Sequence, residues 1–197
     1  AVYFEERCDY SEEVLNTLSL GEGRVFYGRK NFTDKSHVDW LKKQDLDFLI
    51  TVYWPWLLPD NVYNSSKHTL NFHPALLPVN RGWYPHVHSI LDGSKCGVTL
   101  HQICSEADAG DIWIQKEISV EINETSKDIY LKLQDEIFEL FSSSWDDISL
   151  GKCSPIPQQH AQASYHAKVE LNVIDLIKLD QLSGIELFNI LRARSFG

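Results

Sequence analysis

Apolar residues along the first part of this chain occur in short runs, and one of these runs is apolar on both of its faces. Residues 48–53 have this character, which is typical of a central strand in a parallel sheet. Shorter strand patterns occur at residues 2–4 and 24–27. Valine, isoleucine, threonine and tryptophan recur at strand-like spacing in residues 97–103 and 112–120. The pattern predicts a strand in each of these segments.

Helical patterns alternate with these strands. Residues 11–18 begin with a serine followed by acids, which favours a helix start, and Val38, Leu41 and Leu46 mark a second helix. A long helix is predicted from Thr125, because a carboxylate three residues later is placed for a capping box. Its apolar stripe consists of Ile129, Tyr130, Leu133, Ile137, Leu140 and Phe141. This alternation predicts an α/β fold with a doubly wound, mostly parallel sheet flanked by helices, in which ligands gather at the carboxyl ends of strands.

The length and the apolar content fit one main domain. A chain of 197 residues with 43% hydrophobic residues can bury one substantial core, which we expect within residues 1–153. Residues 154–159 combine prolines with polar residues and predict a linker. The apolar positions of residues 171–191 predict a small helical extension, so residues 154–197 are interpreted as linker and short C-terminal extension.

The charge balance and the apolar runs narrow the class of protein. The chain has 28 acidic and 18 basic residues, a formal charge of -10, which disfavours nucleic acid as a partner. No apolar run approaches the roughly 20 residues that span a bilayer, and the first nine residues lack a signal pattern. The 4 cysteines lack a Cys-x-x-Cys spacing, which fits reduced thiols. We therefore expect a cytoplasmic protein without membrane contact.

The strongest candidate for chemistry is the segment around Asn71. Asn71 and His73 lie two residues apart in an extended pattern, so they project from one face while Leu70 and Phe72 anchor the other. Pro74 then ends the strand, which places the polar side chains at the rim of the sheet. An amide donor and an imidazole therefore lie side by side.

Asp108 completes an acyl-transfer site if its loop folds over the end of this strand. A neutral histidine, with an ordinary pKa of about 6.5, accepts a proton near pH 7, and an aspartate fixes its tautomer. An asparagine amide donates to a carbonyl oxygen as that oxygen gains negative charge. Ser89 and Ser105 lack a nucleophile-elbow context, so direct attack by a substrate amine is the simpler scheme.

These residues resemble the motifs of the folate-dependent N-formyltransferases, which transfer a formyl group from 10-formyltetrahydrofolate to an amine. The family pattern runs Asn-x-His-Pro-small-Leu-Leu-Pro, then Arg-Gly, then Gly-Val-Thr-x-His, then Asp-x-Gly. It matches residues 71–78, 81–82, 97–101 and 108–110 here, with Ile112, Ile114 and Gln115 following. Order, spacing and residue types agree across the middle of the chain.

The resemblance implies roles for individual residues. Asn71 would hold the formyl oxygen, His73 would manage the proton and charge of the tetrahedral intermediate, and Asp108 would orient His73 and assist proton removal. The implied cosubstrate is 10-formyltetrahydrofolate, and no metal is implied. The implied pteridine pocket consists of Trp54, Trp56, Leu57, Glu106 and Ala107, because flat aromatic walls suit a flat ring.

Departures from the pattern indicate the branch of the family. Residues 5–9 are acidic and lack the glycine-rich phosphate loop of the phosphoribosylglycinamide enzyme. The transfer-RNA-directed enzyme would need a larger, basic carboxyl-terminal domain, and the folate-hydrolysing relative carries an added amino-terminal domain. The remaining branch acts on amino-deoxysugars attached to nucleotides. Residues 78–85 resemble the Arg-Gly-aromatic-x-Pro loop of that branch, and residues 164–166 and 191–196 resemble its carboxyl-terminal segment. Its substrate would contact Arg81, Gly82, Trp83, Tyr84, Gln102 and Arg192, and a homodimer is plausible.

Other functions stay open on the sequence alone. Within the family the alternative is a phosphoribosylglycinamide formyltransferase, and outside catalysis it is a folate-binding relative without turnover. The intact Asn71, His73 and Asp108 argue against an inert relative. A metal-dependent deacylase would need zinc on histidines such as His73, His86, His88 and His101, but carboxylate or cysteine ligands are not placed near them.

Overall fold

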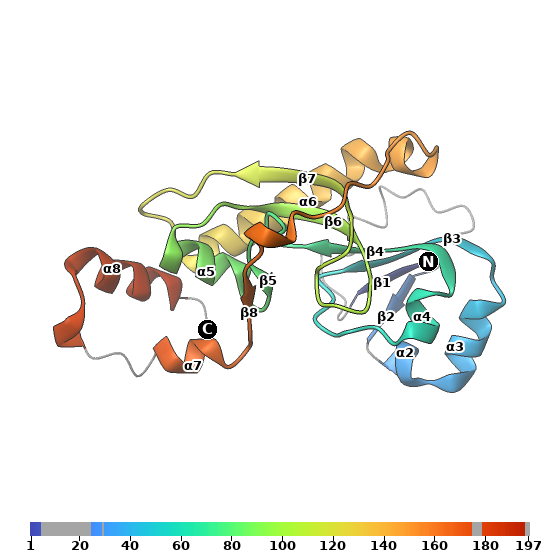
Figure 1. Cartoon of the computed structure of the whole chain (residues 1–197), viewed down its shortest axis with the longest axis horizontal. Coiled ribbons are helices and arrows are strands. Elements are labelled where there is room, and N and C mark those ends of the chain that lie inside the picture. The colour runs from blue at the N-terminus through green and yellow to red at the C-terminus, as the bar shows by residue number, and fades with distance from the viewer. Residues whose placement is uncertain (5–24, 29, 175–178, 196–197) are drawn as a thin grey trace.

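The core of the fold is a mixed sheet of six strands in the order β2-β1-β3-β4-β6-β7 (Figure 1). The computed structural model describes residues 1–4, 25–28, 30–174 and 179–195. The strands are β1 Val2–Phe4, β2 Val25–Tyr27, β3 Leu46–Val52, β4 Ser66–His73, β6 Cys96–Gln102 and β7 Ile112–Ile118. Strands β2, β1, β3 and β4 run parallel, whereas β6 is antiparallel to both β4 and β7. This confirms the predicted α/β fold with a mostly parallel sheet.

Helices cover both faces of the sheet. They are α2 Lys30–Thr33, α3 Lys35–Lys42, α4 Asp60–Tyr63, α5 Pro85–Asp92, α6 Ser126–Ser149, α7 Glu170–Ile174 and α8 Gly184–Ala193. Two short 3-10 helices, η1 His160–Gln162 and η2 Leu179–Gln181, lie in the C-terminal part. A separate two-stranded sheet pairs β5 Arg81–Gly82 with β8 Tyr165–His166 in parallel. Among the described residues no helix has the length and apolarity to cross a membrane.

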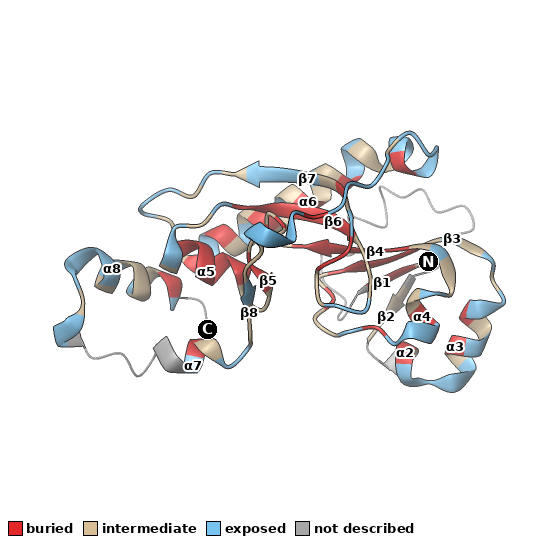
Figure 2. Cartoon of the chain, in the orientation of Figure 1, coloured by how far each residue is buried: buried red, intermediate tan, exposed pale blue. Residues whose placement is uncertain are grey.

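Strand β3 is buried on both faces, which explains its continuous apolar run. Leu49 packs into the core formed with α2, α3 and α4, whereas Ile50 and Val52 pack into the core formed with α6. Leu70 and Phe72 of β4 also face α6, so Asn71 and His73 project from the opposite face. Burial is concentrated in the central strands and α5, and the edge strand β7 is largely exposed (Figure 2).

Most local predictions are confirmed. Thr125 and Asp128 form the predicted reciprocal capping box at the start of α6. The small helical extension is present as α7 and α8. Leu46 begins strand β3 instead of continuing a helix, because α3 ends at Lys42 and the chain turns before the strand. The helix predicted at residues 11–18 lies outside the described residues.

The predicted linker at residues 154–159 is packed against the sheet instead of connecting two units freely. Ile156 forms a two-way backbone bridge with Ile112 at the start of β7, with both N–H to O distances at 2.8 Å. The side chain of Gln158 is only 5% exposed. This segment therefore contributes to the same folded unit as the sheet.

Candidate active site

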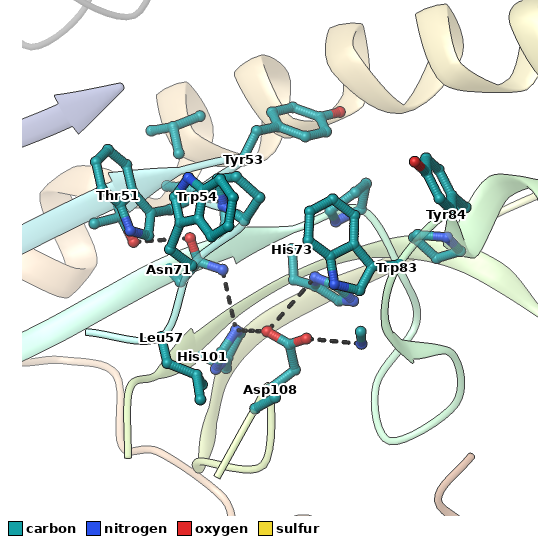
Figure 3. A pocket seen from close by; sticks show the side chains of 18 of the residues that line it. Thr51, Tyr53, Trp54, Leu57, Asn71, His73, Trp83, Tyr84, His101 and Asp108 are labelled. Atoms are coloured by element: carbon teal, nitrogen blue, oxygen red, sulfur yellow. Dashed lines mark hydrogen bonds and ion pairs between the residues drawn. The ribbon is translucent and has the colours of Figure 1, made fainter. Parts of the chain in front are cut away.

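One cavity of about 1100 Å³ opens at the carboxyl ends of β3 and β4 (Figure 3). Asn71, His73 and Asp108 all line it, so the structure brings the predicted catalytic residues together. The predicted pteridine pocket residues Trp54, Trp56, Leu57, Glu106 and Ala107 line it as well. So do Gly82, Trp83 and Tyr84 among the residues predicted to bind the acceptor.

Asn71 is oriented by a hydroxyl on the neighbouring strand. The register places Asn71 beside Thr51 of β3 on one side and His101 of β6 on the other. Thr51 Oγ1 donates a hydrogen bond to Asn71 Oδ1 at 2.8 Å, which turns the Asn71 Nδ2 group toward His101 Nε2 at 3.5 Å. The amide donor is therefore held toward the other polar residues of the site, as Figure 3 shows.

His73 is held with one defined tautomer. Its Nε2 lies 3.1 Å from the carbonyl oxygen of Asn80, and because a carbonyl only accepts, the proton of the neutral ring is on Nε2. The other nitrogen, Nδ1, faces Asp108 Oδ1 at 3.7 Å. Burial lowers the pKa of His73, and the opposing charge of Asp108 does not fully reverse this effect. Near pH 7 the ring is therefore neutral, with Nδ1 able to accept a proton.

Asp108 places a carboxylate beside His73 and His101. Burial alone would raise the pKa of its carboxyl, but His73, His101 and the backbone N–H of Gly82 together hold that pKa well below its ordinary value. The Gly82 N–H donates to Oδ2 at 2.9 Å, and Oδ1 lies 3.4 Å from His101 Nε2. The carboxylate is therefore ionised and in place to stabilise a protonated His73.

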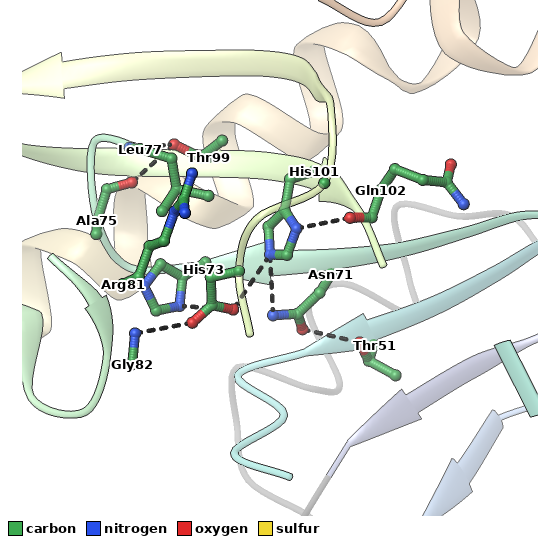
Figure 4. A network of polar contacts seen from close by, with 12 residues as sticks. Thr51, Asn71, His73, Ala75, Leu77, Arg81, Gly82, Thr99, His101 and Gln102 are labelled. Carbon is green, nitrogen blue, oxygen red and sulfur yellow. Dashed lines mark hydrogen bonds and ion pairs between the residues drawn. The ribbon is translucent and has the colours of Figure 1, made fainter. Parts of the chain in front are cut away.

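His101, which was named above only as a possible zinc ligand, belongs to this network. Its Nδ1 donates to the carbonyl of Gln102 at 2.9 Å (Figure 4). Its Nε2 therefore faces both Asn71 and Asp108 (Figure 3). The signal in the sequence was the spacing of Thr99 and His101, two polar residues on one face of an otherwise apolar strand.

Asn80 is a second contributor that sequence reasoning missed. Its backbone carbonyl accepts the His73 hydrogen bond, and its backbone N–H donates to Ser164 Oγ at 2.8 Å. Its side-chain Oδ1 lies 3.1 Å from His166 Nε2. The tautomer of His73 therefore depends on a residue anchored by the strand β8 region, more than 80 positions further along the chain.

Three residues predicted to bind the acceptor do not line the cavity. Arg81 is buried and donates to Gln158 Oε1 at 2.6 Å. Arg192 donates to the carbonyls of Glu121 and Glu124 at 3.2 and 2.9 Å. The side chain of Gln102 is also absent from the lining. The guanidinium donors of Arg81 and Arg192 therefore serve the fold. Arg194, the C-cap residue that directly follows α8, lines the cavity.

The histidines do not form the zinc site that the sequence left open. Among the described residues, the group with metal-ligand proximity is His88, His166 and Glu170. The rings of His88 and His166 are stacked, with centroids 3.6 Å apart and planes within 8°. Because the lone pair of an imidazole lies in its ring plane, two stacked rings do not point at one ion.

Comparison with known proteins identifies the family. A family model described as formyl transferase matches residues 7–144, so the chain belongs to the formyl transferase family. The methionyl-tRNA formyltransferase of Sulfurihydrogenibium sp. is 31% identical over 86% of this chain and 54% of its own length. The dTDP-4-amino-4,6-dideoxyglucose formyltransferase of Mycobacterium tuberculosis is 43% identical over 42% of this chain and 35% of its own length.

A solved structure resembles nearly the whole chain. The formyltransferase PseJ from Anoxybacillus kamchatkensis, in complex with UDP-4,6-dideoxy-4-formamido-L-AltNAc and tetrahydrofolate, aligns with a TM-score of 0.77 and 26% identity. The alignment covers 98% of this chain and 97% of that one. By contrast, the chain spans about half or less of the length of the two relatives above, at 54% and 35%.

Proposed function

We propose that this protein transfers a formyl group from 10-formyltetrahydrofolate to the amino group of a nucleotide-linked amino-deoxysugar. The observation that carries the proposal is the convergence of Asn71, His73 and Asp108 on one wall of a large cavity in a chain of this family. An amide donor, a neutral imidazole and an ionised carboxylate are the groups that acyl transfer to an amine requires.

The proposed reaction uses these three groups in turn. The amine attacks the formyl carbon, a new C–N bond forms, and the formyl oxygen gains negative charge that the Nδ2 group of Asn71 stabilises. The amine proton passes to Nδ1 of His73, which the nearby carboxylate of Asp108 stabilises as imidazolium. The bond from carbon to N10 of the folate then breaks, and His73 returns the proton to N10.

The formyl donor fits the side of the cavity that follows β3. Trp56 is half-buried there and packs against the core cluster of the buried Trp54, which itself packs edge to face against Phe32. Leu57 is 68% exposed at the rim, so an apolar and aromatic surface is available for contact with a flat ring. Tetrahydrofolate in the complex of the Anoxybacillus enzyme supports a folate cosubstrate.

The amino-sugar acceptor fits the part of the cavity that Trp83 and Tyr84 line. Trp83 and Tyr84 offer aromatic faces for stacking, and Arg194 supplies a cation suited to a phosphate group. The names of the mycobacterial relative and of the Anoxybacillus complex support an acceptor of this class, because both refer to nucleotide-linked amino sugars.

A second candidate acceptor is methionyl-tRNA. The similarity to the Sulfurihydrogenibium enzyme over 86% of the chain favours it. The formal charge of -10 weighs against it, because proteins that bind RNA neutralise its phosphates with Lys and Arg. Phosphoribosylglycinamide is the remaining acceptor to compare.

The test is to incubate the protein with 10-formyltetrahydrofolate and each acceptor in turn, and to follow the release of tetrahydrofolate. The panel contains UDP- and dTDP-linked amino-deoxysugars, methionyl-tRNA and phosphoribosylglycinamide. We expect release with a sugar nucleotide, and loss of that release in the His73→Ala variant. If only methionyl-tRNA led to release of tetrahydrofolate, methionyl-tRNA would take the place of the amino sugar as the proposed acceptor. If no amine led to release, the proposed transferase activity would be refuted.

A further inference from the structure

Gln158 lies in the segment between α6 and β8, and its side chain is hydrogen-bonded at every position it offers. Its Nε2 donates to the backbone carbonyls of Asp108 at 2.8 Å and Gly110 at 2.6 Å. Its Oε1 accepts from Nε of Arg81 at 3.2 Å and from Nη2 of Arg81 at 2.6 Å. An amide has two N–H donors and two acceptor lone pairs, so this buried side chain is fully satisfied.

These four bonds join the two segments that determine where the carboxylate of Asp108 lies. One segment is the loop of Asp108 itself. The other is β5, in which Arg81 precedes Gly82, whose N–H donates to Asp108 Oδ2 at 2.9 Å. Gln158 therefore fixes the backbone of the aspartate and, through the neighbouring arginine, the group that binds its side chain.

The loop needs such support because its backbone is unusual. Asp108 has a φ of 51°, in the left-handed region that residues with a side chain seldom occupy. Such a conformation persists only where the surroundings determine it. Gln158 holds the Asp108 carbonyl, which belongs to the peptide directly after this strained residue.

We propose that Gln158 is a positioning residue for the proton-transfer pair, acting on Asp108 and through it on His73. Its catalytic consequence rests on the proposed formyl transfer, but its effect on the placement of the carboxylate does not. The functional unit then extends past residue 153, because the segment predicted as a linker holds part of the site in place.

Two substitutions separate positioning from general packing. Gln158→Met keeps the length and burial of the side chain and removes all four hydrogen bonds. Gln158→Glu keeps an acceptor for Arg81, but places a carboxylate oxygen against the carbonyls of Asp108 and Gly110. The matched control is Gln159→Met, because Gln159 is the exposed neighbour.

The first readout needs no turnover. The imidazole of His73 is titrated by NMR in the wild-type protein and in each variant. In Gln158→Met the carboxylate of Asp108 moves away from Nδ1, so we expect the pKa of His73 to fall below the wild-type value. In Gln159→Met it should not change. An unchanged His73 titration in folded Gln158→Met would overturn the proposal.

The second readout is steady-state kinetics with the acceptor that the panel identifies. We expect kcat to fall about 10-fold to 100-fold in both Gln158 variants, because small displacements of catalytic groups have effects of this size. KM for the formyl donor should change less than about threefold. Wild-type kcat in Gln158→Glu would overturn the proposal, and that variant also decides the matter if Gln158→Met does not fold. A wild-type protein without turnover would refute the proposed function, while the NMR titration still decides the positioning role.

Discussion

At the scale of single residues, the site depends on which end of an amide faces the cavity. Thr51 donates to Oδ1 of Asn71 and thereby presents Nδ2. We expect Asn71→Ala to lower kcat about 100-fold to 1000-fold, because a donor to the developing oxyanion is lost. Thr51→Val keeps the shape and removes only the orienting hydroxyl, so a smaller loss of about fivefold is expected, equivalent to one ordinary hydrogen bond. Equal losses in both variants would contradict this division of roles.

The protonation of His73 predicts the acid side of the pH profile. Because burial lowers its pKa below the ordinary 6.5, the ring stays a proton acceptor at pH 7 and loses this ability only as the pH falls through the lowered value. We expect kcat to fall on that side. The carboxylate of Asp108 raises the pKa of His73, so Asp108→Asn should move the acid limb to lower pH while reducing kcat. A pH–rate profile measures the position of the acid limb and the value of kcat. An acid limb at higher pH in Asp108→Asn than in the wild-type protein would contradict the prediction.

Some of the site residues could be predicted from the sequence, and others could not. Asn71 and His73 were predictable because strand alternation alone puts them on one face. Arg81 and Arg192 were predicted to bind the acceptor, but in the structure neither lines the cavity. A guanidinium binds a buried amide or carbonyl oxygen as well as it binds a phosphate, and these two bind such oxygens. Which of these acceptors is present depends on tertiary contacts.

At the scale of elements, the pairing of β5 with β8 requires a glycine. Gly82 has a φ of +88°, and a Cβ there would lie 2.4 Å from the carbonyl oxygen of His166. We expect Gly82→Ala to separate the two strands and to displace the N–H that binds Asp108, so kcat should fall at least about 10-fold. The free energy of unfolding, measured by urea denaturation, should fall by more than the about 1–2 kcal/mol that left-handed strain alone costs, because the new Cβ also meets the His166 carbonyl.

Gly93 provides the matched control for this substitution. It also has a positive φ, of +68°, but nothing lies within 4 Å of its ideal Cβ position. Gly93→Ala should therefore lose only the stability that left-handed backbone strain costs, and its kcat should stay at the wild-type value. If the two alanine variants lost equal stability and both kept activity, the close approach of β8 to Gly82 would have no functional importance.

Elements with local signals were predictable, and contacts between distant elements were not. The capping box of Thr125 and Asp128 lies within four consecutive residues, and the apolar pattern of β3 lies within seven. Asn80 and Gln158 act through partners that are 84 and 50 positions away along the chain. Neither residue interrupts a periodic pattern, so their roles emerge only once β5 and β8 are paired.

At the scale of the whole molecule, buried histidines make stability depend on pH. Burial, assisted by the charge of His88, lowers the pKa of His86 to about 4. The unfolded chain takes up this proton near pH 6.5, whereas the folded chain does so only near the lowered value. Free energy of unfolding is therefore fully retained above pH 6.5 and falls as the pH drops toward 4, by about 3 kcal/mol for this residue.

Urea unfolding at a series of pH values measures this dependence. His86→Phe keeps an aromatic ring beside Tyr130 and removes the titrating group, so the slope between pH 4 and 6.5 should become shallower. His73 has a lowered pKa for the same reason and should leave a residual slope in the variant. An unchanged slope would show that His86 is not the group responsible.

The continuity of the cavity on both sides of Asn71, His73 and Asp108 has a consequence for inhibition. Because both reactants of the proposed reaction would meet in one space of about 1100 Å³, a single compound could join a pteridine-like ring to an aromatic, anionic group. Once one half binds, the other is held at a high effective concentration, so its binding becomes an intramolecular event. A short linker that crosses the catalytic wall should therefore give an affinity well above that of either fragment.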